Sequence, residues 1–238
     1  MSLLDKKTFP YLAPNKDIYS RYGYIFKLKI PIKKRKFKRF IDIFFSLNFL
    51  FMTFPFILFF ISIYLIEMLF VKSSRGYLFY YYFSMSAGKK FKKYKIRTIK
   101  KSYIDKNLDS IHKWGAHKAE WNNEALTYTG KFIKLFYLDE VPQFYNILKG
   151  DISLIGPRAL SEEHYMADIK QGNNYRKVIT AGLIGLGHAN KGTNEMGNPK
   201  YEYEYLDSYI NNSFYQFYFL EIKIIYKSIL LVLKGGGH

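Results

Sequence analysis

The sequence contains no cysteine in its 238 residues. Disulfide scaffolds, thiolate metal sites and cysteine nucleophiles are therefore excluded. The sequence also lacks a G-x-x-x-x-G-K-[ST] phosphate-binding loop and an H-E-x-x-H metal motif. The stretch GLIGLG at 182–187 is not the dinucleotide fingerprint, and His112 and His117, with Glu120 nearby, do not have the spacing of that metal motif. We therefore expect no nucleotide-binding fold of these classes and no histidine metal site.

Acidic residues are few compared with basic ones. The chain has 19 Asp and Glu against 37 Lys and Arg, which gives a formal net charge of +18. Such a balance implies an anionic partner, and nucleic acid, anionic lipid and phosphorylated substrates all qualify. The first ten residues contain no apolar core, so we expect no cleavable signal peptide.

One segment is long and apolar enough to enter a bilayer. Residues 40–66 (FIDIFFSLNFLFMTFPFILFFISIYLI) contain a single acid, Asp42, and a central proline, Pro55. A straight span needs about 20 residues and puts its flanks on opposite sides of the membrane. A helix broken at Pro55 could instead enter and leave through one leaflet. Both flanks are basic, which favours the re-entrant geometry on the cytoplasmic side, with a spanning helix or a plain anchor as the alternatives.

The rest of the chain predicts short elements. Residues 77–99 alternate and indicate a hairpin with a turn at Ala87-Gly88, and residues 131–149 have helical character interrupted before Pro142 and ended by Gly150. The other expectations are a loop with a short helix at 100–129, an extended piece at 151–156, a helix at 160–171, a glycine-rich loop at 181–197 and an amphipathic helix at 214–234.

These patterns predict a membrane-associated α+β fold in three parts. Residues 1–37 form a basic and aromatic arm, whose first 26 residues we expect to be poorly ordered or to lie on the surface. Residues 38–72 form the re-entrant membrane helix, and residues 73–238 form a cytosolic domain of helices and short strands. The C-terminal helix of that domain is expected to lie on the membrane interface, with a core helix as the alternative.

Two adjacent carboxylates, Asp139 and Glu140, are unusual in so basic a chain. Proline is tolerated in a first helical turn, so Pro142 lets both acids start a helix that runs to Lys149. A helix N-terminus stabilises negative charge, which would keep Asp139 ionised, as a carboxylate nucleophile must be. Glu140 offers the hard oxygen ligands that Mg²⁺ prefers, with phosphate completing the shell. Simple helix capping is the alternative for both residues.

Basic residues that suit a phosphate occur on both sides of this acidic pair in the sequence. The Gly156-Pro157 turn aims Arg158, whose planar guanidinium matches a phosphate with two bonds. Lys95 and Arg97 share one face of the predicted hairpin, because their spacing is two. The alternatives are solvated or lipid-facing roles, or single-stranded nucleic-acid binding by basic and aromatic patches. The neighbouring membrane segment makes lipid phosphate the simpler partner, and we expect no nucleic acid.

With these residues in view, the chain resembles the bacterial sugar transferases, the monotopic polyprenyl-phosphate glycosyl-1-phosphate transferases. The similarity covers residues 38–236, and YLDEVPQFYNILKGDISLIGPRAL at 137–160 matches the family's central signature. The other matching stretches are KRFIDIFFSL at 38–47, a proline at the family's helix break, KYKIRTI at 93–99, GLIGLGHANKG at 182–192 and FLEIKII at 219–225.

The resemblance implies a two-step reaction. Asp139 would attack the β-phosphorus of a UDP-sugar and release UMP, and polyprenyl (undecaprenyl) phosphate would then take the phosphosugar from the aspartyl enzyme. Glu140 would hold Mg²⁺, and Arg158 would bind a phosphate. Lys134, at the position of a family arginine, and Gln143, within the signature, are further substrate-binding residues that the resemblance implies. It also implies a place on the cytoplasmic face of a bacterial inner membrane, in the first membrane step of surface polysaccharide or glycoconjugate synthesis.

The sequence departs from the family pattern at several positions. Gly76-Tyr77 replaces a Gly-Pro pair, Phe83 replaces a basic position, and His188 replaces the glutamine of the glycine loop. The nucleophile, the metal ligand and the Gly-Pro-Arg turn are present. An inactive relative that serves as a membrane scaffold in glycan assembly is therefore the alternative function. The identity of the sugar, and whether the chain forms a homodimer, are left open.

Overall fold

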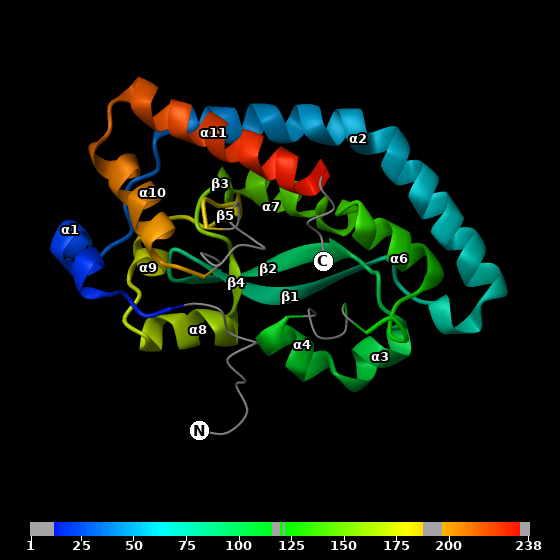
Figure 1. The fold of residues 1–238 in the computed structure, drawn as a ribbon. Coiled ribbons are helices and arrows are strands. Elements are labelled where there is room, and N and C mark those ends of the chain that lie inside the picture. The colour runs from blue at the N-terminus through cyan, green and yellow to red at the C-terminus, as the bar shows by residue number, and fades with distance from the viewer. Residues whose placement is uncertain (1–11, 116–119, 121, 188–196, 234–238) are drawn as a thin grey trace. The chain divides into compact units, whose positions relative to one another are not determined.

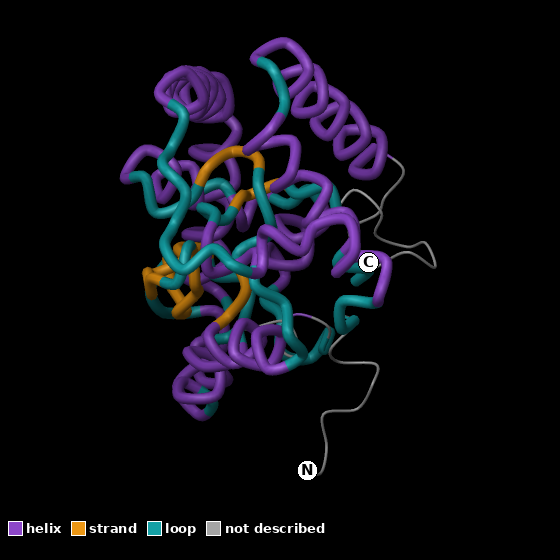
Figure 2. Tube along the Cα trace, turned by 90° about the vertical axis from the view of Figure 1, so that its left-hand side faces the viewer, coloured by secondary structure: helices purple, strands orange, loops and turns teal. Residues whose placement is uncertain are grey.

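The structure is a computed structural model that describes residues 12–115, 120, 122–187 and 197–233 (Figure 1). Helices make up most of the described chain, and the strands are short (Figure 2). The chain divides into two compact units, which we treat one at a time. The α2 unit has its described residues within 35–84 and 91–151. The α10 unit has its described residues within 12–34, 85–90 and 152–233.

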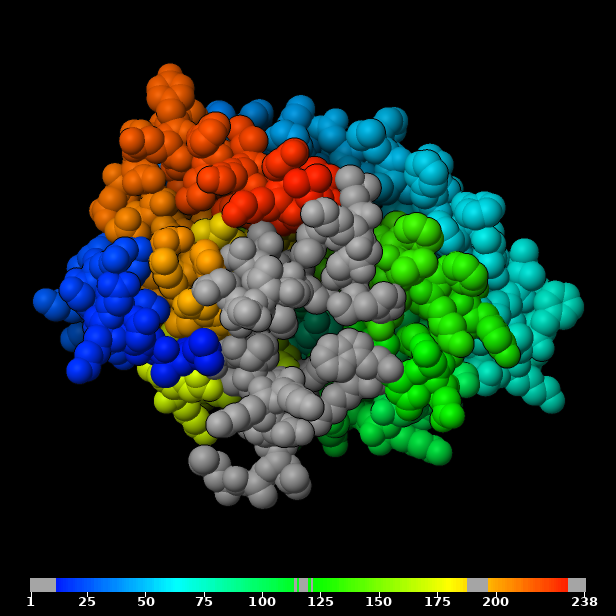
Figure 3. All heavy atoms as spheres, viewed as in Figure 1, coloured from blue at the N-terminus to red at the C-terminus, as the bar shows by residue number. Residues whose placement is uncertain are grey.

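The longest element of the α2 unit is the helix α2 (Lys36–Phe70). By length and composition it is the one helix of the described residues that could cross a membrane. Most of its large apolar side chains point outward, and the helix lies on the surface in the space-filling view of Figure 3, coloured blue to cyan. The predicted apolar helix at this position is confirmed.

The path of α2 differs from the predicted pair of half-helices. The helix is continuous through Pro55 and changes direction partway along its length (Figure 1). A proline inside a helix removes one backbone donor and is a common cause of such bends. With 35 residues the helix is about 50 Å long at 1.5 Å per residue, well above the roughly 30 Å of bilayer hydrocarbon. Whether it leaves through the leaflet by which it entered stays a prediction.

A hairpin and short helices complete the first part of the α2 unit. The predicted hairpin is confirmed as β1 (Phe79–Ser86) and β2 (Lys89–Ile96), with positive φ at Ala87 and Gly88 in the turn. Two positive φ angles suit the two-residue turns that match strand twist. Where a loop with one short helix was predicted, the described residues include the helices α3 (Lys101–Lys106) and α4 (Leu108–Trp114). The 3-10 turn η1 (Lys72–Ser74) follows α2.

The predicted helical run at 131–149 is divided into three elements: α6 (Tyr128–Leu135), the 3-10 turn η2 (Leu138–Glu140) and α7 (Gln143–Lys149). Tyr137 has φ of 55°, which ends the helical path after α6, and Gly150 has φ of 85° and ends α7. Asp139 and Glu140 therefore lie in η2, ahead of α7, and the prediction that they begin α7 is wrong.

The α10 unit is built from helices around a small parallel strand pair. β3 (Ser153–Ile155) pairs with β5 (Gly182–Ile184), with Ser153 opposite Gly182. A Cβ on Gly182 would lie 2.1 Å from the backbone nitrogen of Gly156, so this close approach requires glycine. The other elements are α1 (Lys16–Phe26), β4 (Leu160–Ser161), which is next to β1 in the sheet order β2-β1-β4, α8 (Glu162–Lys170), α9 (Tyr175–Val178), α10 (Lys200–Asn211) and α11 (Phe214–Leu233).

These elements confirm the extended piece at 151–156 and the helices at 160–171 and 214–234. The glycine-rich loop at 181–197 contains the short strand β5, and its residues 188–196 lie outside the described residues.

The described part of the N-terminal segment contains a packed helix at the surface, which agrees with the second of the two predicted alternatives. Asn15 caps α1 by accepting a hydrogen bond from the backbone N–H of Ile18, which is buried. The Tyr24 hydroxyl donates to Asp207 of α10 at 2.6 Å, and the ring of Phe26 stacks on Tyr203 of the same helix.

The C-terminal helix α11 has apolar side chains on both its buried and its exposed sides. Phe217 and Ile224 are fully buried, whereas Phe219, Ile222 and Tyr226 are more than half exposed. An exposed apolar stripe along a surface helix is typical of contact with a partner or a membrane.

Candidate active site

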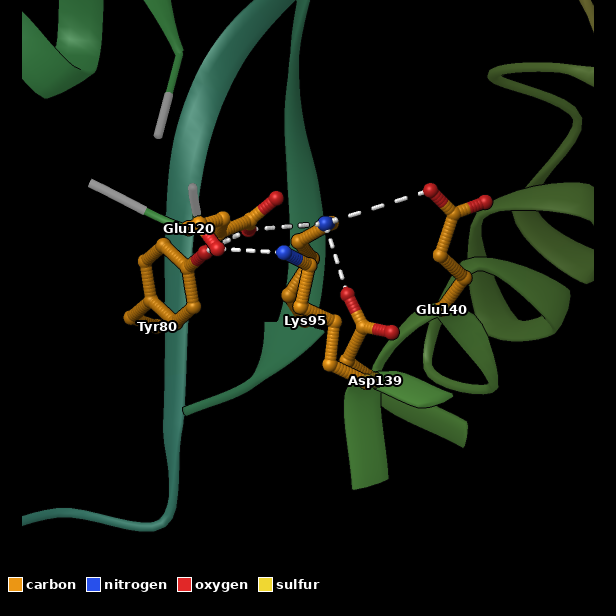
Figure 4. Close-up of polar contacts among 6 residues, drawn as sticks. Tyr80, Lys95, Glu120, Asp139 and Glu140 are labelled. Atoms are coloured by element: carbon orange, nitrogen blue, oxygen red, sulfur yellow. Dashed lines mark hydrogen bonds and ion pairs between the residues drawn. The ribbon is translucent and has the colours of Figure 1, made fainter. Parts of the chain in front are cut away.

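The α2 unit contains a buried ammonium surrounded by three carboxylates (Figure 4). The Nζ atom of Lys95 lies 2.7 Å from Oδ2 of Asp139, 2.9 Å from Oε1 of Glu120 and 3.9 Å from Oε1 of Glu140. The Tyr80 hydroxyl donates a hydrogen bond of 2.9 Å to Glu120. Sequence reasoning had named Lys95 and both acids of the signature, but not Glu120 or Tyr80 as members of a site.

Local structure explains why these side chains face one another. Phe91, Lys93 and Lys95 are buried at alternate positions of β2, so Lys95 points to the inner side of the strand. Leu138, which precedes the nucleophile candidate, packs on a hydrophobic cluster of Tyr64, Ile96 and Ile133. Ile96 follows Lys95 in the sequence, and Leu138 precedes Asp139. Because both of these residues pack in the same cluster, the core fixes the backbone positions of Lys95 and Asp139.

The electrostatics of the cluster depend on burial and on Lys95. Burial raises the pKa of Asp139 to about 6, against the opposing effect of the Lys95 ammonium and with further increases from Glu120 and Glu140. Burial alone would lower the pKa of Lys95, but Asp139 and Glu120 raise it well above its usual range. Asp139 is therefore mostly ionised at pH 7. Its partner is Lys95, and the prediction that a helix N-terminus keeps it ionised is replaced by this ion pair.

The charge balance suits a divalent cation. Three carboxylates face one ammonium, and Glu140 keeps 15% of its side chain exposed, whereas Asp139 keeps 4%. Magnesium commonly takes one or two protein carboxylates and completes its shell with water and substrate phosphates. No group of three or more His, Asp or Glu side chains within the described ranges is arranged to hold a metal by itself. Glu140 thus fits the role of a single protein ligand beside a phosphorylated substrate.

Gln143 carries an unsatisfied buried amide. The side chain is fully buried at the first position of α7, and neither its nitrogen nor its oxygen has a hydrogen-bond partner among the described residues. Burying an amide without partners costs free energy, so such groups usually meet a ligand or an ordered water. Gln143 follows Asp139 and Glu140 within one turn of chain, which makes it a candidate substrate contact, as predicted.

The helix α7 is bonded to the rest of the α2 unit from its middle, through Asn146, and at its C-terminal end, through Arg39. Asn146 is buried and bonds the backbone of β2, donating to the carbonyl of Lys92 and accepting from the N–H of Tyr94. Arg39 of α2 donates to the carbonyls of Ile147 and Leu148 at 2.5 and 2.6 Å. A helix leaves its last carbonyls without internal partners, and a cation placed there satisfies them and complements the helix dipole.

The side chain of Arg97 stabilises the fold by bonding to the backbone. Its side chain is fully buried and donates to the backbone carbonyls of Tyr77, Ser74 and Ile99 at 2.6, 2.6 and 2.8 Å. These bonds connect the chain after α2 to the end of the hairpin. A contact between Arg97 and a substrate phosphate stays a prediction.

Two other predicted phosphate ligands have different surroundings. Lys134 of α6 donates to the backbone carbonyl of Glu120, which brings it next to the Lys95 cluster. Arg158 belongs to the α10 unit, where it donates to the carbonyl of Leu183 at 3.2 Å and its own carbonyl accepts from Arg176 at 2.7 Å. The predicted proximity of Arg158 to Asp139 stays a prediction.

The histidines take no part in this cluster as far as the structure describes them. His112 stacks on the ring of Tyr81, with the ring centroids 5.1 Å apart, and His117 lies outside the described residues. Glu120, which the sequence offered as their neighbour, bonds Lys95 and Tyr80 instead.

Comparison with known proteins identifies a family whose model matches most of the chain. A family model described as "Bacterial sugar transferase" matches residues 33–235. Among curated relatives, the undecaprenyl-phosphate galactose phosphotransferase of Salmonella typhimurium is 30% identical over 164 residues, covering 63% of this chain and 32% of the relative. The UDP-glucose:undecaprenyl-phosphate glucose-1-phosphate transferase of Klebsiella pneumoniae is 32% identical over 155 residues, covering 62% of this chain and 30% of the relative.

A shorter and more similar match is the putative undecaprenyl-phosphate N-acetylgalactosaminyl 1-phosphate transferase of Bacillus subtilis. It is 45% identical over 71 residues, which cover 30% of this chain and 35% of the relative. The chain thus spans about a third of the length of these relatives.

Proposed function

Because the chain belongs to the bacterial sugar transferase family, we propose that it transfers a sugar 1-phosphate from a UDP-sugar to polyprenyl phosphate. The single observation that carries this proposal is the buried pair of Lys95 and Asp139, with Glu140 beside it. A carboxylate that is ionised, fixed in position and adjacent to a magnesium-type ligand has the properties needed to attack a phosphorus atom.

In the first step an Asp139 carboxylate oxygen forms a bond to the β-phosphorus of the UDP-sugar. The bond from that phosphorus to the bridging oxygen breaks, and UMP leaves with the electron pair. In this proposal Lys95 orients the carboxylate, and the amide of Gln143 and the ammonium of Lys134 contact phosphate oxygens. The support is that the Gln143 amide has no hydrogen-bond partner among the described residues and that Lys134 lies beside the Lys95 cluster. A magnesium ion held by Glu140 would neutralise negative charge on the diphosphate. In the second step a phosphate oxygen of the lipid attacks the same phosphorus and releases Asp139.

The decisive experiment replaces Asp139 with Asn, which keeps the shape and removes the charge. We expect loss of UMP release from every UDP-sugar and loss of phosphosugar label on the protein. Asp109→Asn, an exposed acid on α4, is the matched control and should behave as the parent. UMP release by Asp139→Asn at the parent rate would refute the covalent role. A parent protein that binds polyprenyl phosphate but releases no UMP from any UDP-sugar would favour the membrane scaffold instead.

The proposal includes a re-entrant position for α2 on the cytoplasmic face of the inner membrane. Its support is that both halves of α2 contact the same unit. Arg39 and Phe49, in the first half, bond and stack on α7. Glu67, near the end, accepts from the backbone N–H groups of Tyr128 and Thr129 in α6. A straight spanning helix would put about 30 Å of hydrocarbon between its two ends, whereas here both ends meet short, consecutive elements.

Single cysteines test this topology, since the chain has none of its own. Cysteines at Lys36 and at Lys72 should both react with an impermeant reagent from the cytoplasmic side alone. Labelling from opposite sides would establish a spanning helix. The exposed apolar side chains of α11 are proposed to contact the membrane as well, and a fluorophore attached at Ile222 should shift to the blue when vesicles are added.

A further inference from the structure

An apolar groove lies within the α2 unit between the second half of α2 and the helix α6. It has a volume of about 450 Å³, which is within the range of about 300–1,000 Å³ that is usual for small-molecule sites. Its walls are almost entirely apolar, and it is lined by Phe60, Ile63, Ile66, Glu67, Tyr128, Thr129 and Phe132.

The single charged group in the lining is already satisfied. Glu67 accepts hydrogen bonds from the backbone N–H groups of Tyr128 and Thr129 and from the hydroxyl of Ser74. It therefore caps the start of α6 and leaves the groove with no charge that requires a polar ligand. An apolar ligand is the one that fits.

Two observations identify the occupant. The groove opens on α2, the helix whose apolar surface is suited to lipid, and Ile66 and Phe132 in its walls are more than half exposed. The groove also borders the catalytic cluster: Phe60 packs on the same hydrophobic cluster as Leu138 and Ile96, which flank Asp139 and Lys95 in the sequence. A chain lying in the groove therefore contacts a residue, Phe60, that packs on the same cluster as the sequence neighbours of Asp139 and Lys95.

The helix α6 borders both the groove and the charged cluster. Phe132 lines the groove, and Lys134, on another face of the helix, donates to the carbonyl of Glu120 beside Lys95. The groove and the proposed reaction site are thus on two faces of one short helix. An acceptor that must attack a phosphosugar on Asp139 needs its chain bound near this helix, whereas a phospholipid does not.

We propose that this groove binds the isoprenoid chain of the lipid acceptor. The proposal rests on the proposed function, since it assigns the chain-binding part of the second step. The groove is adjacent to the first-step residues and shares none of them, so its loss should slow the transfer to lipid and leave the release of UMP intact.

A substitution that fills the groove tests this directly. Ile63→Trp adds bulk inside the groove while α2 stays apolar, and Leu65→Trp adds the same bulk outside the groove, on an exposed residue of the same helix. Both variants and the parent are first loaded with the phosphosugar and then given undecaprenyl phosphate. We expect Ile63→Trp to slow transfer to undecaprenyl phosphate about tenfold, the scale on which apolar pockets discriminate, and to leave UMP release unchanged.

The possible results distinguish a failure of the groove proposal from a failure of the proposed function. If Ile63→Trp transfers to undecaprenyl phosphate at the parent rate, or if Leu65→Trp loses as much as Ile63→Trp, the groove is not the chain site. If the parent releases no UMP, the proposed function fails before the groove is tested by activity. Binding then provides the readout: an undecaprenyl phosphate carrying a photoreactive group in its chain should label α6 or α2 around the groove. Unlabelled undecaprenyl phosphate should compete, and competition by phosphatidylglycerol alone to the same extent would overturn the proposal.

Discussion

Lys95 and Asp139 form an ion pair of 2.7 Å in which both side chains are almost completely removed from solvent. A buried charge that loses its partner is strongly destabilising, whereas removing both charges together costs much less. The pair therefore links the stability of the α2 unit to the chemistry of the site. Lys95 is the residue through which Glu120 and Tyr80, on other elements, act on the nucleophile.

The first prediction concerns Lys95→Met. It should abolish UMP release and lower the free energy of unfolding by about 3 kcal/mol, because Asp139 and Glu120 remain buried without a counter-charge. The measurement is denaturant unfolding in detergent together with the UMP assay. The double variant Lys95→Met with Asp139→Asn should recover part of the lost stability and none of the activity. A single variant as stable as the parent would show that the pair is not buried in solution.

The second prediction concerns Arg39, which satisfies the last carbonyls of α7. Arg39→Ala should cost about 2 kcal/mol, since hydrogen bonds from a charged donor are worth roughly 1.5–3 kcal/mol. The same change should lower kcat for UMP release more than it raises KM for the UDP-sugar, because α7 follows directly on the turn that carries Asp139. Lys36→Ala, an exposed residue one turn earlier, is the control and should change neither quantity.

The third prediction tests whether Arg97 stabilises the fold or contacts a substrate phosphate. Its donors are bonded to three backbone carbonyls. Arg97→Lys cannot reproduce three divergent bonds, so the midpoint of thermal unfolding should fall while KM for the UDP-sugar at low temperature stays near the parent value. A large increase in KM with unchanged thermal stability would instead restore the substrate contact that the sequence predicted.

The site illustrates what sequence can and cannot provide. Asp139, Glu140 and Gln143 were identified because they occur in a dense motif, and Lys95 because of its position on the basic strand of the predicted hairpin. The structure brings Lys95, Asp139 and Glu140 together. Glu120 was not identified because nothing in its local sequence distinguishes it. Its role comes from a contact across 25 positions of sequence with Lys95, which no periodicity reveals.

In the fold, too, some elements follow from the local sequence and others do not. The hairpin at 79–96 and the long apolar helix follow from local rules of alternation and hydropathy, and both are confirmed. In the run at 131–149 the interruption before Pro142 is confirmed. The earlier break at Tyr137 was missed, because it depends on a left-handed conformation that this residue type does not favour. The helix α1 was missed for another reason: its stability comes from packing against α10, as in the bond from Tyr24 to Asp207.

The fourth prediction concerns Glu202 of α10, a buried carboxyl in the α10 unit. Burial raises its pKa from 4.5 to about 7, with Arg176 opposing and Asp168 adding to the increase. Its Oε2 atom has no hydrogen-bond partner within the described part of the chain. Between these two pKa values the folded chain keeps the proton that the unfolded chain has lost, so the folded state binds more protons and stability falls as pH rises.

Glu202→Gln should remove this dependence. Below about pH 4.5 the parent and the variant should have similar stability, since Glu202 is protonated in both states of the parent. As pH rises from 4.5 to about 7 the parent should lose stability relative to the variant, by roughly 3 kcal/mol in total at 1.36 kcal/mol per pKa unit. Glu204→Gln, on the same helix, is the control and should follow the parent at every pH. The measurement is the difference in unfolding free energy between variant and parent across pH 4 to 8. The contributions of the other titrating groups cancel in this difference. A difference that stays constant with pH would mean that Glu202 is ionised in the folded chain, with a partner for its charge.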